Sequence, residues 1–137
     1  KDKIINIEIK SQKIFSEGME IPTIALIEKY NLIDRAVVSS FNPFVLRKIY
    51  KKNNKILLAQ LLDYNQPYSS YYWVYVSKPS FLHINIEQIS QFNAKNINKI
   101  GLPVFAYTVN SYEHLKKVNL LGIKGVFTDN PQLFIDL

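Results

Sequence analysis

Hydrophobic and polar residues alternate strictly at the start of the chain, where residues 4–10 have the sequence IINIEIK. The isoleucines after the first one fall on one side of an extended backbone, and Asn6, Glu8 and Lys10 fall on the other. β-Branched residues of this kind favour a strand over a helix. The stretch therefore predicts a strand with one apolar face and one polar face.

The rest of the chain alternates between short apolar runs and longer segments with helical spacing. Asn42-Pro43 and Asn110-Ser111 are typical of helix starts, because they place a capping side chain before the first turn. An aromatic-rich stretch, 64–79, breaks the alternation, and we interpret it as a loop. We expect further strands at 36–41, 55–61, 81–84, 104–109 and 124–128, and helices at 20–30, 43–52, 85–99, 112–121 and 132–137.

Strands that alternate with helices over short connections predict βα units and a parallel sheet. The candidate folds are a doubly wound sheet and a (β/α) barrel, and no Gly-rich phosphate loop follows any strand. Polar residues gather at the carboxyl ends of several strands, where a barrel has its active-site mouth and a doubly wound sheet its crevice. This pattern favours the barrel. The residues are Glu8, Lys10, Ser39, Ser40, Gln60, His83, Thr108, Asn110, Thr128 and Asp129.

Composition and charge limit the classes of function that this chain can have. The 137 residues are 47% hydrophobic and 20% charged, which indicates one globular domain, and no apolar run approaches the roughly 18 residues of a membrane span. The chain has no cysteine, so disulfides, thiolate metal sites and cysteine nucleophiles are excluded. Much of the net charge of +6 lies in 47–55, which we interpret as a solvated helix face and end. A patch for nucleic acid or an anionic membrane is the alternative.

Five segments of the chain resemble the glycerophosphodiester phosphodiesterases in their order and spacing. The resemblance covers nearly the whole chain, its first and last segments are the most specific, and within the family it is strongest to the small bacterial cytosolic type. The segments are 6–10 (NIEIK), 38–42 (VSSFN), 83–85 (HIN), 107–110 (YTVN) and 122–131 (GIKGVFTDNP).

The resemblance implies an α/β fold of the TIM (β/α)8 barrel type. It also implies metal-dependent hydrolysis of small glycerophosphodiesters to glycerol 3-phosphate and an alcohol, with Mg²⁺ or Ca²⁺ as the cofactor. In the family pattern the glutamate at Glu8 is a metal ligand and the lysine at Lys10 lies in the active site near the phosphate. Both roles suit the chemistry, because hard cations prefer carboxylate oxygens and an ammonium group offsets phosphoryl charge.

Three further residues are candidates for substrate contacts. Phe41 and Tyr107 could line the pocket for the glycerol or headgroup, although aromatic residues at strand ends often belong to the core. His83 is expected to line the pocket at most, and a buried structural histidine is the alternative. His114, the other histidine, is expected to be solvated, and Asp129 is expected to cap the terminal helix.

Several motifs of the family do not occur in this sequence. These are a His-Arg-Gly strand, a Pro-Glu-Asn-Thr segment, a Glu-x-Asp-Val strand and a strand that ends in His-Asp, which supply two catalytic histidines and the other metal carboxylates. We therefore expect residues 1–137 to be the C-terminal segment of a single barrel domain, with about five βα units. We expect it to be inactive without the N-terminal half. The resemblance also implies a cytoplasmic location.

Two other function classes stay open. The chain could be a non-catalytic barrel remnant that acts as an interaction module, since an open segment leaves strand edges and apolar faces unpaired. A nucleic-acid binder centred on 47–55 is the weaker hypothesis, because no aromatic-basic recognition motif accompanies the lysines. We therefore expect no nucleic-acid partner.

Overall fold

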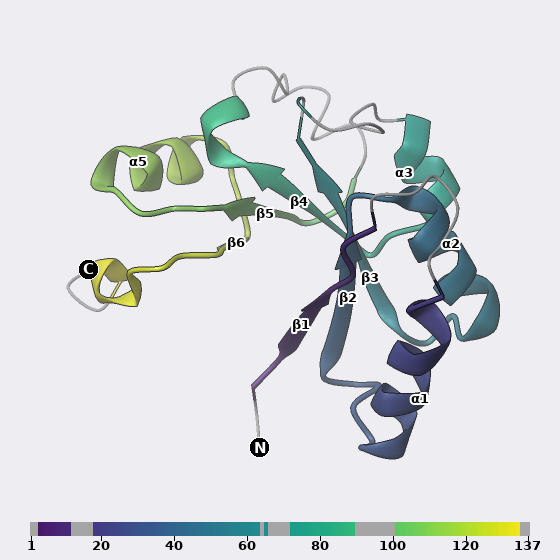
Figure 1. The fold of residues 1–137 in the computed structure, drawn as a ribbon. Coiled ribbons are helices and arrows are strands. Elements are labelled where there is room, and N and C mark those ends of the chain that lie inside the picture. Colours follow the sequence, from purple (N-terminus) through teal and green to yellow (C-terminus); the bar gives the residue numbers. More distant parts are fainter. Residues whose placement is uncertain (1–2, 12–17, 64, 66–71, 90–100, 135–137) are drawn as a thin grey trace. The chain divides into compact units, whose positions relative to one another are not determined.

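The computed structural model of the chain describes residues 3–11, 18–63, 65, 72–89 and 101–134. The chain divides into two compact units, Lys1–Phe81 and Leu82–Leu137. In the described residues each unit has three strands that pair in parallel in the order of the sequence, with helices between them (Figure 1). The predicted alternation of strands and helices is thus present in both units.

The first unit is built on three parallel strands. Glu8 pairs in register with Ser39, and Ser39 in turn with Ala59, so the three positions form one row across the strands. Because the strands are parallel, their carboxyl ends lie at the same edge. The elements are β1 (Ile5–Glu8), α1 (Glu20–Lys29), β2 (Ala36–Ser40), α2 (Pro43–Lys52), β3 (Leu57–Leu62) and α3 (Tyr72–Ser77).

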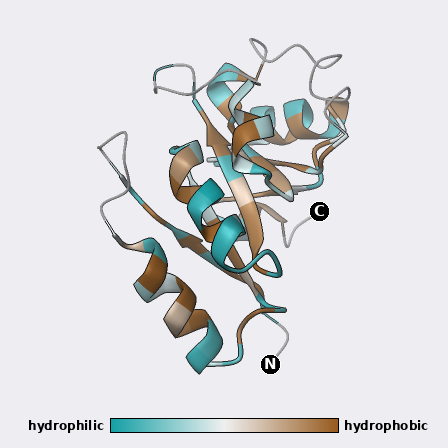
Figure 2. Ribbon diagram, turned by 90° about the vertical axis from the view of Figure 1, so that its right-hand side faces the viewer, coloured by the Kyte–Doolittle hydropathy of each residue, from teal (hydrophilic) through white to brown (hydrophobic). Residues whose placement is uncertain are grey.

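One face of these strands packs against the helices and forms an apolar core. On β1 this face carries Ile9 and the partly buried Ile7, whose neighbours in the core come from β2, β3, α1 and α2. In Figure 2 the strands are mostly brown, and the helices carry bands of brown and teal. Since side chains alternate along a strand, Asn6, Glu8 and Lys10 face away from the helices. The core residues are Ile9, Ile24, Ile27, Ala36, Val38, Val45, Leu46, Ile49, Ile56 and Leu58.

The helix α2 begins as the sequence predicts. The Asn42 side-chain oxygen accepts a hydrogen bond of 2.9 Å from the Phe44 backbone N–H, and Pro43 occupies the first helical position. The basic residues Lys51 and Lys52 lie in the last turn, where they complement the helix dipole. This placement agrees with a solvated helix end for the basic stretch.

The aromatic-rich stretch differs from the prediction. Its end forms the helix α3, whereas the sequence pattern indicated a loop for 64–79. Trp73 of α3 packs edge-on against Phe44 of α2, with 5.5 Å between ring centroids. Packing of this kind overrides weak local propensity, because β-branched and aromatic residues accept a helix when it buries them. Residues 64 and 66–71 of the stretch lie outside the described part.

The second unit repeats the βα arrangement with shorter elements. Ser111 caps α5 by accepting a 3.2 Å hydrogen bond from the His114 N–H, and Gly122 follows the helix with a φ of +66°, as its C-cap position requires. The elements are β4 (Phe81–Asn85), the 3₁₀ helix η1 (Ile86–Gln88), β5 (Val104–Tyr107), α5 (Tyr112–Leu120), β6 (Gly125–Val126) and the 3₁₀ helix η2 (Pro131–Phe134).

Two predicted helices of the second unit differ from what is described. At the start of the segment 85–99 there is a single 3₁₀ turn, η1, capped by Asn85, and residues 90–100 lie outside the described part. Where the terminal helix 132–137 was predicted, the described residues form the 3₁₀ turn η2, Pro131–Phe134, and residues 135–137 lie outside the described part. Among the described residues, no helix is long and apolar enough to cross a membrane.

The cap of α2 gives a direct test of the fold. Replacing Asn42 with Ala removes the acceptor for the Phe44 N–H and should lower the free energy of unfolding by about 1 kcal/mol. Urea unfolding followed by circular dichroism measures the loss. Asn54→Ala, at an exposed turn position beyond the helix, is the matched control. Equal midpoints for the two variants would contradict the capping role.

Candidate functional site

The polar face of β1 is the first element of the candidate site, and we call Asn6, Glu8 and Lys10 the β1 polar wall. All three side chains are exposed. The Asn6 amide Nδ2 donates a 3.1 Å hydrogen bond to the Ser39 hydroxyl, which ties the wall to β2. The wall is therefore tied to β2 at Asn6, and the exposed charged side chains of Glu8 and Lys10 lie at its carboxyl end.

The strand positions in register with Glu8 carry small side chains. The adjacent positions across the row are Ser39 and Ala59, both of which have small side chains. Lys10 lies two residues further along the extended chain, about 7 Å away at the usual rise of a strand. A carboxylate and an ammonium group thus stand on one face at the strand end, next to a region of small side chains.

Two residues from the predicted mouth face the other way. Ser40 and Gln60 are both fully buried, at 0% exposure. They pair in register and share the face of Val38 and Leu58, which packs against the helices. Their positions at strand ends predicted that they line the mouth of a barrel. Because side chains alternate along a strand, they lie instead on the face opposite to Ser39 and Ala59. They contact backbone carbonyls instead of an open site.

Phe41 directly follows β2 and is half-buried. Its carbonyl oxygen accepts a 2.9 Å hydrogen bond from Gln60 Nε2, which holds the turn between β2 and α2. Phe41 thus occupies the carboxyl end of its strand, as the sequence indicated. Its contact with substrate stays a prediction.

His83, in the second unit, is buried on β4 with 4% exposure. Its ring lies 4.7 Å from that of Phe127, edge-on, and 5.8 Å from that of Phe105. Burial lowers the pKa of His83 from 6.5 to about 4, because the charged imidazolium loses its hydration. The ring is therefore neutral at pH 7 and suits an apolar contact better than proton donation.

Phe105 requires a glycine on the neighbouring strand. Gly125 pairs with Phe105 in register, and a Cβ atom at Gly125 would lie 2.5 Å from the phenyl ring. Tyr107 is half-buried and shares the face of Phe105 on β5, since the two are two residues apart. The substrate contact predicted for Tyr107 stays a prediction.

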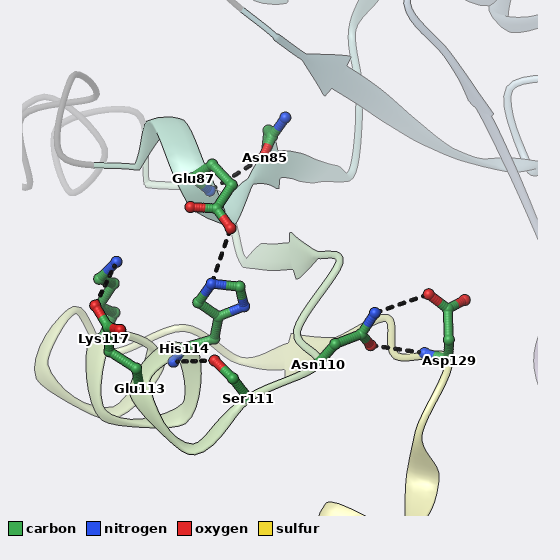
Figure 3. Close-up of polar contacts among 8 residues, drawn as sticks. All are labelled: Asn85, Glu87, Asn110, Ser111, Glu113, His114, Lys117 and Asp129. Atoms are coloured by element: carbon green, nitrogen blue, oxygen red, sulfur yellow. Dashed lines mark hydrogen bonds and ion pairs between the residues drawn. The ribbon is translucent and has the colours of Figure 1, made fainter.

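A polar network joins the carboxyl ends of β5 and β6 (Figure 3). Asn110 Nδ2 donates to Asp129 Oδ2 at 2.8 Å, and Asn110 Oδ1 accepts from the Asp129 N–H at 2.9 Å. The Thr128 hydroxyl also donates to Asn110 Oδ1, at 3.1 Å. The sequence predicted Asp129 as a helix cap, whereas the described contact of its carboxylate is with Asn110 across the two strand ends.

His114 was expected to be solvated, and that prediction is wrong. Its Nε2 lies 2.9 Å from Glu87 Oε1, and its side chain is only 16% exposed (Figure 3). Glu87 belongs to η1, whose start is held by the Asn85 side chain accepting from the Glu87 N–H at 3.0 Å. Sequence spacing gave no sign of this pair, because the two residues are far apart in the chain.

The described residues do not by themselves form a metal site. They contain no group of three or more His, Cys, Asp or Glu side chains that could hold a metal ion. Glu8 offers one carboxylate, whereas Mg²⁺ and Ca²⁺ take six or more oxygen ligands. The described part of the chain can therefore supply one ligand of such a site but not the whole set.

Comparison with known proteins identifies the family. Residues 3–133 match the model of the glycerophosphoryl diester phosphodiesterase family. The chain belongs to this family. It is 30% identical over its full length to a glycerophosphodiester phosphodiesterase of Caldanaerobacter subterraneus subsp. tengcongensis, of which it covers 56%.

Solved structures of the family show the same fold. A glycerophosphodiester phosphodiesterase of Thermotoga maritima is 26% identical, with a TM-score of 0.73 over 98% of this chain and 57% of that one. An Oleispira antarctica phosphodiesterase, solved with its product sn-glycerol-3-phosphate, is 25% identical, with a TM-score of 0.67 over 97% and 54%. The chain thus spans about half the length of these relatives. The predicted fold class, a part of a TIM-type barrel, is confirmed.

The buried histidine predicts a specific pH dependence of stability. Between about pH 4 and pH 6.5 the unfolded chain binds a proton on His83 that the folded chain does not bind, so the free energy of unfolding rises with pH. The contribution is complete above pH 6.5 and is lost as the pH falls through about 4. From the pKa difference it amounts to about 3 kcal/mol.

The measurement is urea unfolding at pH 7 and pH 4.5 for the wild type and His83→Leu. The wild type should lose about 2 to 3 kcal/mol more than the variant on acidification, because only the wild type carries the imidazole. His114→Gln is the control for the other histidine. Equal losses in wild type and His83→Leu would show that burial does not hold His83 neutral.

Proposed function

We propose that the chain forms part of the barrel of an enzyme that hydrolyses small glycerophosphodiesters to glycerol 3-phosphate and an alcohol. The β1 polar wall is the observation that carries this proposal, since it presents a carboxylate and an ammonium group at a strand end, away from the core. The names of the relatives support the reaction class. The product bound by the Oleispira antarctica protein supports glycerol 3-phosphate as the product.

Glu8 is proposed as one oxygen ligand of a divalent metal, Mg²⁺ or Ca²⁺. A carboxylate is the ligand type these cations prefer, and the Glu8 side chain is exposed on the face opposite the core. The other ligands would come from residues outside the described part of this chain. When bound, the metal would neutralise charge on the phosphodiester.

Lys10 is proposed as the catalytic residue of this chain that offsets phosphate charge. Its ammonium group stands on the face of Glu8 and beyond it toward the strand end. A fixed positive charge there would favour the negative charge that builds up on the phosphoryl oxygens during hydrolysis. No histidine of this chain is assigned a proton-transfer role, because His83 is buried and neutral and His114 is bound to Glu87.

Phe41, His83 and Tyr107 are proposed as substrate contacts within their own units. Each lies on a strand or directly after one, and each offers an aromatic ring. Rings of this kind suit the carbon face of glycerol or of an alcohol headgroup. For His83 the neutral ring and its packing against Phe127 support an apolar contact.

The catalytic chemistry is proposed to need residues that this chain lacks. The 137 residues hold neither the family's histidine motifs nor its other metal carboxylates. We therefore propose that the chain corresponds to the C-terminal segment of one barrel domain and is inactive by itself. Its partner would be the N-terminal half of such a barrel. A cytoplasmic location is proposed from the resemblance to the small bacterial cytosolic type.

A hybrid protein tests the proposal. Residues 1–137 are joined to the part of the Thermotoga maritima relative that this chain does not match, and release of glycerol 3-phosphate from glycerophosphocholine is measured with Mg²⁺ or Ca²⁺. The hybrid should be active, and removal of the metal with EDTA should abolish turnover. The 137 residues alone should show none. Robust turnover by the short chain would contradict the need for the other half.

In the active hybrid, Glu8→Gln should lower the turnover rate by about a hundredfold or more, because the amide is a poor ligand for a hard cation. Added metal should rescue the variant poorly. Glu28→Gln is the matched control, since Glu28 is an exposed glutamate on α1 whose described contact is with Asn53. A wild-type rate in Glu8→Gln would remove Glu8 from the metal site.

A further inference from the structure

Two buried polar residues lie directly behind the β1 polar wall. Ser40 and Gln60 have 0% exposure and occupy the helix-facing side of β2 and β3, next to the apolar core. Buried polar groups at such positions are costly unless their hydrogen bonds serve the structure or the site. Their contacts show what they hold.

The Ser40 hydroxyl holds the backbone between Glu8 and Lys10. It donates a 2.8 Å hydrogen bond to the carbonyl of Ile9, and it accepts one of 3.1 Å from the Asn42 N–H. The Ile9 N–H donates to the Ser39 carbonyl at 2.8 Å. Both polar groups of the Ile9 backbone are therefore fixed by the end of β2, just beyond the last residue of β1.

Gln60 holds the turn that follows β2. Its Nε2 donates to the carbonyls of Phe41 at 2.9 Å and Leu61 at 3.1 Å. Its Oε1 is buried and has no hydrogen-bond partner among the described residues. A glutamine kept only to fill the core would be better replaced by leucine, because the unpartnered oxygen opposes folding. The free-energy cost of burying this oxygen is explained if the position of the turn matters for the site.

We propose that Ser40 and Gln60 are positioning residues for the β1 polar wall, with Ser40 setting the direction of Glu8 and Lys10 through the Ile9 carbonyl. Gln60 acts indirectly. It holds the Phe41 carbonyl in the turn after β2, and the Asn42 N–H of the same turn donates to the Ser40 hydroxyl. Neither side chain lies on the face of the wall. The inference rests on the proposed function, since it assigns these contacts to the phosphate-binding role of Lys10.

A positioning role and a merely structural role differ in where the damage appears. Loss of a purely structural hydrogen bond would lower the stability of the unit as a whole. Loss of a positioning contact would loosen the backbone at Ile9 and Lys10 more than the neighbouring ladder at Val38. The contrast is measurable one residue at a time by amide hydrogen exchange.

The test uses the 137-residue chain and five variants, of which four serve the exchange measurement and Lys10→Met serves the binding measurement. Ser40→Ala removes the hydroxyl, and Ser40→Thr keeps it and should restore wild-type behaviour. Ser77→Ala is the matched control, because Ser77 is equally buried and its hydroxyl donates to the Val74 carbonyl at 3.3 Å in α3. Gln60→Met removes the amide while keeping a similar shape.

Amide exchange is the first readout. In Ser40→Ala the Asn42 amide loses its acceptor and should exchange roughly tenfold faster, the factor expected for one lost hydrogen bond. The Ile9 amide should exchange at least about threefold faster relative to the Val38 amide, because the Ile9 carbonyl is no longer held. In Gln60→Met the Asn42 amide should show a similar gain. Ser40→Thr and Ser77→Ala should keep the wild-type ratio. Wild-type protection of Ile9 in Ser40→Ala, or an equal change in Ser77→Ala, would overturn the proposal.

Binding of sn-glycerol 3-phosphate is the second readout, followed in every variant through the backbone amide signals of Glu8 and Ile9 in nuclear magnetic resonance spectra. Ser40→Ala should raise the dissociation constant about threefold to tenfold, because the ammonium group is no longer held in place. Lys10→Met should abolish binding. Unchanged binding in Lys10→Met would refute the proposed role of Lys10. Amide exchange at Ile9 would still decide whether Ser40 holds the β1 polar wall. The same measurement would decide it if the wild-type chain did not bind sn-glycerol 3-phosphate.

Discussion

The alternation of side chains along β1 is the constraint on which the first unit depends. Ile7 and Ile9 reach the core formed with α1 and α2, so the residues between and after them must face the other way. A shift of pairing by one residue would bury Glu8 and expose Ile9. The cost of burying an unpaired carboxylate therefore fixes the register. The alternation that places isoleucines in the core therefore also places Asn6, Glu8 and Lys10 on the opposite face. No further interaction is needed to orient them.

The period of two explains both the success and the failure of the sequence analysis. It was enough to predict β1 and its polar wall, while the Asn42-Pro43 motif predicted the cap of α2, because these are local patterns. Ser40 and Gln60 were placed with the mouth because only their position at strand ends was considered. The pair of Glu87 with His114 could not be predicted, because it depends on how α5 packs near η1. Local rules thus gave the elements, and tertiary packing decided the contacts.

Packing also decided the state of His83. A histidine at a strand end is a candidate for proton transfer in any sequence of this kind. Its ring lies against Phe127 and Phe105, and Phe105 occupies the space that Gly125 leaves open. Water is displaced from the ring, so burial favours the neutral form. Packing against these aromatic rings therefore keeps the His83 imidazole uncharged at neutral pH.

The ligand count limits what this chain can contribute to catalysis. A hard divalent cation takes six or more oxygens, and one carboxylate on an exposed strand cannot meet that demand. Glu8 also has the positive charge of Lys10 on its own face, which would compete with a metal for the carboxylate if no further acidic groups were near. In the proposed function a second source of carboxylates would serve two purposes, because it would complete the metal's ligands and release Lys10 for the phosphate. The β1 polar wall would then become a working site only when other acidic residues face it.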